Sequence, residues 1–208
     1  LEQWAYHDIT YALFDEVVFD HDLVDYPHLG LVIQAYLKSS VNDCNHLIQL
    51  SKRRATPFTV RLVKGAYWDF EEVNARQNGF SCPVYTNKGR TDISYEYLSR
   101  ILIENHELIA PAFASHNLRS LIHAIVAAED KGLPQNSIEL QMLYGMSEPL
   151  HRVFAKDGYR VRIYAPIGEL LPGMSYLVRR LLKNTSNSGF CCTLVFCCAS
   201  CHTLLLNQ

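Results

Sequence analysis

Two cations stand three residues apart in the segment Arg61-Leu-Val-Lys64, which ends a run rich in β-branched residues that begins at Phe58. Alternate residues of a strand share a face, so Arg61 and Val63 should point one way and Leu62 and Lys64 the other. A buried arginine is costly unless an anion or a polar ligand meets it. If Arg61 points into the protein, we therefore expect it to contact a ligand.

A flavin ring, with its electron-rich edge, is one such ligand. Gly65 and Ala66 then supply a small turn at which a phosphate-bearing molecule could approach the backbone. The alternative is a structural arginine at the rim of a sheet, paired with a neighbouring carboxylate. The residue types alone leave both interpretations open.

Other candidates stand at the ends of expected elements. Arg179 and Arg180, after Tyr176, could grip a carboxylate from two directions, although adjacent cations on a helix are usually a solvated face. Tyr67 and Tyr164 could wall a small apolar substrate, although rim packing is the commoner role for such rings.

At another expected strand end, Ser115 and His116 could hydrogen-bond a cofactor. A lone histidine in such a place is more often a structural hydrogen-bonding residue.

The elements that must position these residues alternate along the chain. Strand-like runs at 29–36, 58–64, 111–116, 137–143 and 161–166 are separated by helical patterns at 9–19, from 40, and at 68–76, 92–109, 118–130, 148–156 and 174–183. Asp8 is the predicted N-cap of the first helix. This alternation predicts an α/β fold built on a parallel sheet.

Polar or functional residues cluster where the strands end, at Gln34, Lys64, His116, Leu143 and Tyr164. Both a (β/α)8 barrel and an open doubly wound sheet bind ligands at that edge, so position alone does not separate the two folds. A G-x-G-x-x-G motif is absent, which argues against a dinucleotide-binding sheet.

Composition excludes some classes of protein. The chain has 208 residues and a net charge of −2, without the basic stripe of a nucleic-acid-binding protein, so we expect no nucleic-acid partner from this segment. Residues 1–25 lack a secretory leader, and the chain starts at Leu1, which suggests a fragment.

The tail differs from the rest of the chain. Residues 189–208 carry no charge and hold five of the seven cysteines, and we interpret them as a segment that is not native to the fold. Haem attachment at Cys198-Ala-Ser-Cys201-His202, zinc binding and a membrane span are weaker alternatives. We expect no metal site.

Several segments together resemble one family. They are Arg61-Leu-Val-Lys-Gly-Ala-Tyr-Trp-Asp69, Pro83-Val-Tyr-Thr86, Phe113-Ala-Ser-His-Asn117, Leu140-Gln-Met-Leu-Tyr-Gly-Met146 with Glu148-Pro-Leu150, Arg162-Ile-Tyr-Ala-Pro166, and Tyr176-Leu-Val-Arg-Arg-Leu-Leu-Lys-Asn184. In this order they resemble the proline dehydrogenase domain of the bacterial proline utilization A family, over residues 1–188.

The resemblance implies a (β/α)8 TIM-like barrel that binds FAD non-covalently and is incomplete here, without its N-terminal strands. It implies oxidation of L-proline to 1-pyrroline-5-carboxylate in the catabolism of proline to glutamate, with hydride transfer to flavin N5. Electrons would pass to a membrane quinone, and an aldehyde dehydrogenase domain would be fused in the parent chain. The expected location is cytoplasmic, peripheral to the inner face of the membrane.

The resemblance also implies roles for individual residues. Arg179 and Arg180 would hold the proline carboxylate, in a pocket lined by Tyr67, Leu143, Tyr164 and Tyr176. Arg61 would face the flavin, and Arg61 and Tyr164 are the expected catalytic residues. The expected contacts of FAD are Gln34, Arg61, Lys64, Gly65, Ala66, Trp68, Thr86, Lys88, Ser115 and His116.

The sequence departs from the family pattern in three ways. The family's barrel begins before Leu1, Lys183 stands where the family commonly has Glu, and the Cys-rich tail replaces the closing segment. Two hypotheses follow: a proline dehydrogenase domain from a longer chain, or an inactive fragment that cannot close its barrel or retain FAD. A different flavin barrel, such as methylenetetrahydrofolate reductase, explains the alternation but not the ordered segments.

Overall fold

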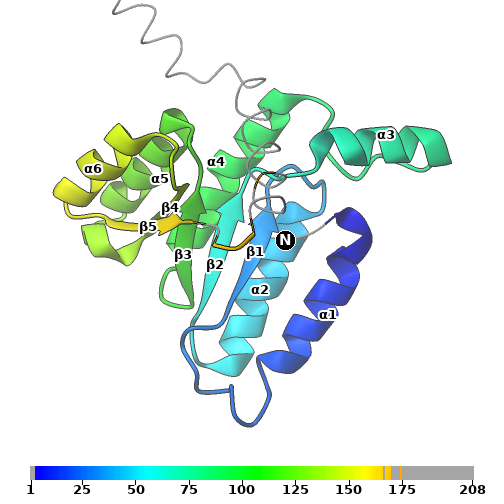
Figure 1. Ribbon diagram of the computed structural model, residues 1–208. Helices are drawn as coiled ribbons and strands as arrows, with labels where there is room; N and C mark the ends of the chain where they lie inside the picture. Colours follow the sequence, from blue (N-terminus) through cyan, green and yellow to red (C-terminus); the bar gives the residue numbers. More distant parts are fainter. Residues whose placement is uncertain (1–2, 166, 170–173, 175–208) are drawn as a thin grey trace, which may run out of the picture.

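The computed structural model describes residues 3–165, 167–169 and 174, which form one sheet flanked by helices (Figure 1). The strands are β1 (Gly30–Gln34), β2 (Phe58–Val63), β3 (Ile109–Ala114), β4 (Glu139–Leu143) and β5 (Arg160–Tyr164). The helices are α1 (His7–Val17), α2 (Ser40–Arg54), α3 (Trp68–Asn78), α4 (Lys88–Glu104), α5 (Leu118–Asp130) and α6 (Glu148–Lys156), with the 3-10 turns η1 (Trp4–Tyr6) and η2 (Gln135–Ser137).

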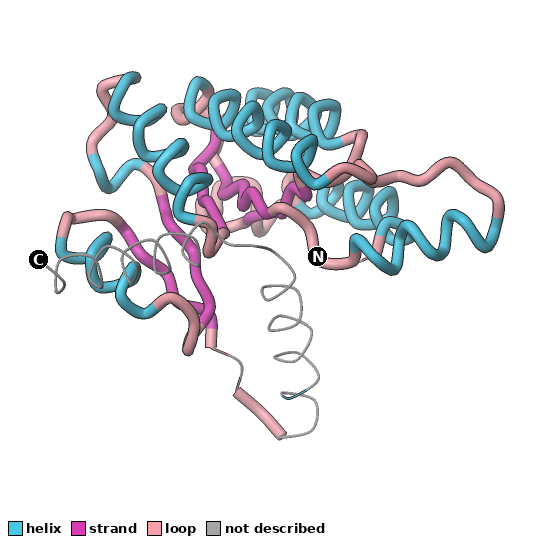
Figure 2. Tube along the Cα trace, turned by 90° about the horizontal axis from the view of Figure 1, so that it is seen from above, coloured by secondary structure: helices cyan, strands magenta, loops and turns pink. Residues whose placement is uncertain are grey.

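The strands follow one another across the sheet in chain order, and each neighbouring pair is parallel. A doubly wound sheet reverses its strand order at a switch point, and no reversal occurs among the described strands. The predicted α/β fold with a parallel sheet is therefore confirmed, and the doubly wound alternative is excluded for this part of the chain. Within residues 3–165 the five strands form an open row, not a closed barrel (Figure 2).

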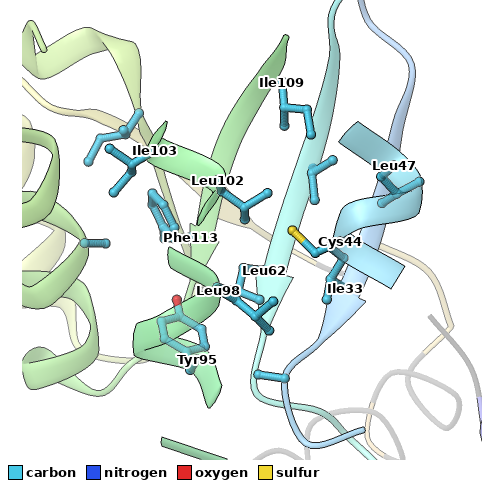
Figure 3. Packing of buried hydrophobic residues seen from close by; sticks show 14 of the residues in the cluster. Ile33, Cys44, Leu47, Leu62, Tyr95, Leu98, Leu102, Ile103, Ile109 and Phe113 are labelled. Atoms are coloured by element: carbon cyan, nitrogen blue, oxygen red, sulfur yellow. The ribbon is translucent and has the colours of Figure 1, made fainter. Parts of the chain in front are cut away.

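The main hydrophobic core lies between the sheet and the helices on one side of it. Leu62 of β2 and Phe113 of β3 belong to one buried cluster with Leu47 of α2 and Leu98 and Leu102 of α4 (Figure 3). Buried residues of α5 and α6 belong to the same cluster. Burying these side chains supplies most of the favourable free energy that holds the helices on the sheet.

The opposite side of the sheet is called here the open face. Side chains of a strand alternate between two faces, so the residues between the core positions of β1 to β5 all point to this side. The open face is formed by Val32, Gln34, Arg61, Val63, Ala112, Ala114, Glu139, Gln141, Arg160 and Arg162.

Helix α1 does not begin as the sequence predicted. Its N-cap is Tyr6, which makes no side-chain capping bond, and Asp8 lies inside the first turn. The Asp8 carboxylate instead contacts Nδ1 of His7 at 2.9 Å. The prediction of Asp8 as the N-cap was therefore wrong, because η1 precedes α1 and carries the chain straight into the helix.

In two helices, only some of the apolar side chains face the core. In α1, Phe14 is buried whereas Ile9 is 67% exposed. In α4, Leu98 is buried whereas Ile93 is 67% and Tyr97 53% exposed. Both helices therefore carry apolar residues on more than one face.

The loop between α1 and β1 is held by Arg54, the last residue of α2. Its buried guanidinium donates from Nε to the carbonyl of Val18 at 3.1 Å and from Nη1 to that of Thr56 at 3.2 Å. Nη2 donates to the carbonyls of Leu23 and Tyr26, both at 2.6 Å. One side chain therefore satisfies four backbone acceptors of irregular segments.

The two cysteines of the described part form no disulfide. Cys44 and Cys82 are both free, and burial raises the pKa of the Cys44 thiol to about 12. Among the described residues, none of the helices is both long and apolar enough to span a membrane. The helix expected at 174–183 and the tail at 189–208 lie outside the described residues, apart from Met174.

Candidate functional site

The carboxyl ends of the five strands meet at one edge of the sheet, as the sequence predicted. Because every strand pair is parallel, Gln34, Lys64, His116, Leu143 and Tyr164 all lie at or just beyond this edge. Tyr164 is directly opposite Leu143 in the register of β4 and β5. The candidate site is therefore this edge together with the adjoining open face.

Arg61 points to the open face, as the strand alternation predicted. Phe58, Val60 and Leu62 are fully buried against the helices, so Arg61 and Val63 take the other side. Arg61 is opposite Val32 on β1 and Ala112 on β3. Its neighbours on the adjoining strands are therefore an apolar and a small residue.

Lys64 follows directly on β2 and is fixed by contacts to α4 and to the segment after β1. Its carbonyl accepts a hydrogen bond from the backbone N–H of Tyr36 at 2.9 Å. Its Nζ forms an ion pair with Asp92 of α4 and lies 5.8 Å from the ring centroid of Tyr95. Burial raises the pKa of the Tyr95 hydroxyl far above its ordinary range, so this ring is neutral.

Gly65 is needed for a close approach of the chain to Tyr36. Its φ of +127° lies in a region that residues with a Cβ rarely adopt, and a Cβ there would be 2.5 Å from the Tyr36 ring. Burial raises the pKa of the Tyr36 hydroxyl, so the ring is a neutral packing surface. Ala66 follows, and Tyr67 is the N-cap residue of α3.

The N-terminus of α4 brings together three more predicted residues. Trp68 Nε1 donates to the carbonyl of Tyr85 at 2.7 Å, and Lys88 Nζ lies 6.0 Å from the centroid of the Trp68 ring. Thr86 precedes Asn87, the N-cap, whose side chain accepts from the N–H of Gly89 at 2.8 Å. A cation is thus held beside the positive end of a helix, which favours an anionic ligand.

Ser115 and His116 connect the ends of β3 and β4. The Ser115 hydroxyl oxygen accepts from the N–H of Asn117 at 3.0 Å, and Nε2 of His116 accepts from the N–H of Leu143 at 3.0 Å. Because Nε2 is an acceptor, a neutral His116 carries its proton on Nδ1. His116 therefore connects the end of β3 to Leu143 at the end of β4.

A polar network on the open face was not predicted from the sequence. Glu139 of β4 accepts from Arg162 of β5 and from the amide of Gln141. The signal was available, since Glu139 and Gln141 are two residues apart, as are Arg160 and Arg162, which places each pair on one face of a strand. Asp92 was also missed, because it pairs with a residue 28 positions away.

Three predicted substrate contacts, Tyr176, Arg179 and Arg180, and Lys183 beside them, lie outside the described residues. The described residues form two shallow surface grooves of about 450 and 430 Å³, and neither is lined by a residue predicted to contact FAD or the substrate. The part of the chain that is described contains no cluster of residues able to hold a metal ion. The candidate site is thus an open surface in the described region, lined by residues able to bind an anionic, partly planar ligand.

Comparison with known proteins identifies the family. The family model described as Proline dehydrogenase matches residues 1–193. The bifunctional protein PutA of Escherichia coli (strain K12) is 40% identical over 190 residues, which cover 88% of this chain and 14% of that protein. Proline dehydrogenase 2 of Bacillus subtilis (strain 168) is 33% identical over 189 residues, which cover 88% of this chain and 56% of that protein.

Solved structures agree with the sequence comparison. Proline utilization A from Bdellovibrio bacteriovorus, inactivated by N-propargylglycine, has a TM-score of 0.88 and 49% identity over 91% of this chain and 20% of that one. The chain therefore spans only a small part of the bifunctional relatives that it matches. The likeness in sequence and in fold covers the strands and helices described above, and the chain belongs to the proline dehydrogenase family.

Proposed function

We propose that this chain forms part of an FAD-dependent proline dehydrogenase that oxidises L-proline to 1-pyrroline-5-carboxylate. The observation that carries the proposal is Arg61, a cation on the open face of a parallel sheet, between Val32 and Ala112, in a member of this family. In an α/β protein the carboxyl edge of the parallel strands is where ligands bind.

The sheet is best explained as an arc of a (β/α)8 barrel. Consecutive parallel strands with helices on one side are the repeating unit of that fold, and five such strands are described. On this proposal residues 1–188 are a partial barrel, the remaining strands belong to a longer chain, and residues 189–208 are not part of the barrel. Both edges of the described sheet are then the places where further strands pair.

FAD fits the residues at the carboxyl edge. Its two phosphates are anions that match Lys64, Lys88 and the N–H groups at the start of α4. Gly65 packs against the Tyr36 ring, and the turn that it forms with the small Ala66 is the proposed place where the backbone approaches the ligand. Gln34, Trp68, Thr86, Ser115 and His116 are the remaining proposed contacts of FAD.

FAD, when bound, supplies the acceptor for a hydride from the proline ring carbon next to nitrogen, while the nitrogen loses a proton and a C=N bond forms. Arg61 stabilises negative charge at the flavin edge. Tyr67, Leu143, Tyr164 and Tyr176 enclose the proline ring. Arg179 and Arg180 hold the proline carboxylate through charge-assisted hydrogen bonds, so the chain supplies orientation and electrostatics.

The electrons then pass to a second acceptor, for which we propose a membrane quinone. The relatives named PutA are described as bifunctional, which supports a fused aldehyde dehydrogenase domain that acts on the product in the parent chain. We place the protein in the cytoplasm, where it meets the inner face of the membrane to deliver electrons.

The pair Arg179 and Arg180 provides the test. In the full-length protein, Arg179→Met with Arg180→Met should raise the KM for proline by at least about 100-fold while FAD stays bound, because two charge-assisted contacts are lost. Lys52→Met with Arg53→Met on α2 is the matched control. An unchanged KM in the first double variant would remove the carboxylate assignment.

A second hypothesis, an inactive fragment, is favoured by the sheet of five strands, which does not close into a barrel within the described residues. The 208-residue chain alone should then show no proline oxidation with a dye acceptor, whereas the longer parent protein should be active. Turnover by the isolated 208-residue chain would contradict this hypothesis.

A further inference from the structure

We propose that Asp92 is a positioning residue, which holds the Lys64 ammonium group where the phosphates of FAD bind. The inference rests on the proposed function and concerns a residue that was assigned neither to FAD nor to the substrate. Asp92 lies in the second turn of α4, four residues after Lys88, and pairs with a lysine that follows a different element, β2.

The main chain of Lys64 cannot move freely. Its carbonyl is bonded to the N–H of Tyr36, and the next residue, Gly65, is pressed against the Tyr36 ring. Only the side chain of Lys64 is therefore left to be positioned.

The side chain of Lys64 is held from two directions. Its Nζ contacts the Asp92 carboxylate and lies 5.8 Å from the centroid of the Tyr95 ring, which is fully buried. The Lys64 side chain is 25% exposed and that of Asp92 47% exposed, so the ion pair lies at the edge of the site and not in the core. An ammonium group has three donors, and one bond to Asp92 leaves two for a ligand.

Two physical effects of Asp92 on FAD binding have opposite signs. A lysine stem loses much rotamer entropy when its end is fixed, so fixing it before the ligand arrives strengthens binding. A carboxylate beside two phosphates, however, repels them. If Asp92 acted only through its charge, its removal would strengthen FAD binding, whereas a positioning role predicts weaker binding.

The experiment measures release of FAD from the full-length holoenzyme by flavin fluorescence on serial dilution. Asp92→Ala should raise the Kd for FAD at least about fivefold, although it removes a negative charge near the phosphates. Asp92→Asn, which keeps an acceptor oxygen and the helix, should give a smaller rise. Glu104→Ala, at the exposed far end of α4, should leave the Kd unchanged.

A double-mutant cycle separates positioning from a purely structural role. In a Lys64→Met background, Asp92→Ala should no longer weaken FAD binding, because the group that Asp92 positions is gone. An unchanged or lower Kd for Asp92→Ala with Lys64 present would overturn the inference and leave the proposed function intact. If Asp92→Ala weakened FAD binding equally with Lys64 and in the Lys64→Met background, the inference would also be overturned. A folded full-length protein that takes up no FAD would overturn the proposed function, and the inference with it.

Discussion

Glu139 and Arg162 form a two-point ion pair between neighbouring strands on the open face. Arg162 Nε lies 2.8 Å from Glu139 Oε1, and Arg162 Nη2 donates to Glu139 Oε2 at 2.8 Å. Gln141 Nε2 also donates to Glu139 Oε1, at 2.5 Å. Because an ionised carboxylate only accepts hydrogen bonds, the amide nitrogen of Gln141 must face Glu139. The amide oxygen of Gln141 is thereby left to accept from other groups on the open face.

Glu139→Ala should lower the free energy of unfolding by about 2 kcal/mol, because it removes two charge-assisted bonds from an arginine and one from an amide. The Glu139 side chain is 9% exposed and that of Arg162 69%, so Arg162 can be rehydrated and the cost stays below that of a fully buried pair. Urea unfolding measures the change. Glu107→Ala, at an exposed position, is the control, and equal stability of the two variants would contradict the prediction.

Gly65→Ala should destabilise the protein by more than about 3 kcal/mol, because the new Cβ meets the Tyr36 ring in addition to the strain at φ +127°. Gly79→Ala is the matched control, since Gly79 has φ +70° and nothing within 4 Å of a built Cβ. It should cost only about 1 kcal/mol. Thermal unfolding of both variants checks the difference, and equal losses would show that contact with Tyr36 is unimportant.

Arg54→Met should cost about 3 kcal/mol of stability and loosen the loop from Phe19 to Leu29, because four carbonyls lose their donor together. Native-state hydrogen exchange should show faster exchange in this loop than in β2. Lys52→Met, on the exposed side of the same helix, should leave both measurements unchanged. Unaltered exchange in the Arg54 variant would refute the role given to this guanidinium.

The free energy of unfolding should decrease as the pH rises and His7 loses its proton. The pKa of His7 is raised from 6.5, first by its hydrogen bond to Asp43 and further by Asp8, although burial acts in the opposite direction. Because the pKa of His7 is higher in the folded than in the unfolded protein, protonated His7 stabilises the fold. This contribution is fully present below about pH 6.5 and is lost as the pH rises through the folded-state pKa. The neighbouring Tyr11 ring stacks on His7 at 4.5 Å and remains neutral in this range.

His7→Gln should remove this part of the pH dependence. Unfolding free energies of the two proteins, measured from about pH 5.5 to about pH 9, should differ most at the acidic end and converge at the alkaline end. A constant difference across the range would contradict an ionised His7 in the folded protein.

The elements with strong local signals were predicted well. Helix α5 has the bounds expected from the sequence, because Asn117 caps it by accepting from the N–H of Ser120 at 3.1 Å. The start of α4 was placed four residues too late, at Asp92 instead of Lys88, because the capping role of Asn87 was overlooked within a loop-like stretch. Local propensity thus located the elements, and capping residues decided their ends.

Only those features of the candidate site that depend on a single strand could be predicted from the sequence. The direction of Arg61 followed from the alternation of β2, which was correct. The pairing of Lys64 with Asp92 and the tie between His116 and Leu143 depend on register between separate elements, which no single stretch of sequence contains. The roles of Tyr176, Arg179 and Arg180 stay predictions.

The consecutive order of β1 to β5 also has a consequence for how the chain folds during synthesis. Each strand pairs with the one made immediately before it, so every new pairing closes only the loop formed by the one or two α-helices that connect the two strands. Residues leave the ribosome slowly compared with the formation of such local contacts. The sheet can therefore grow one strand at a time as the polypeptide emerges, without waiting for a partner encoded far downstream.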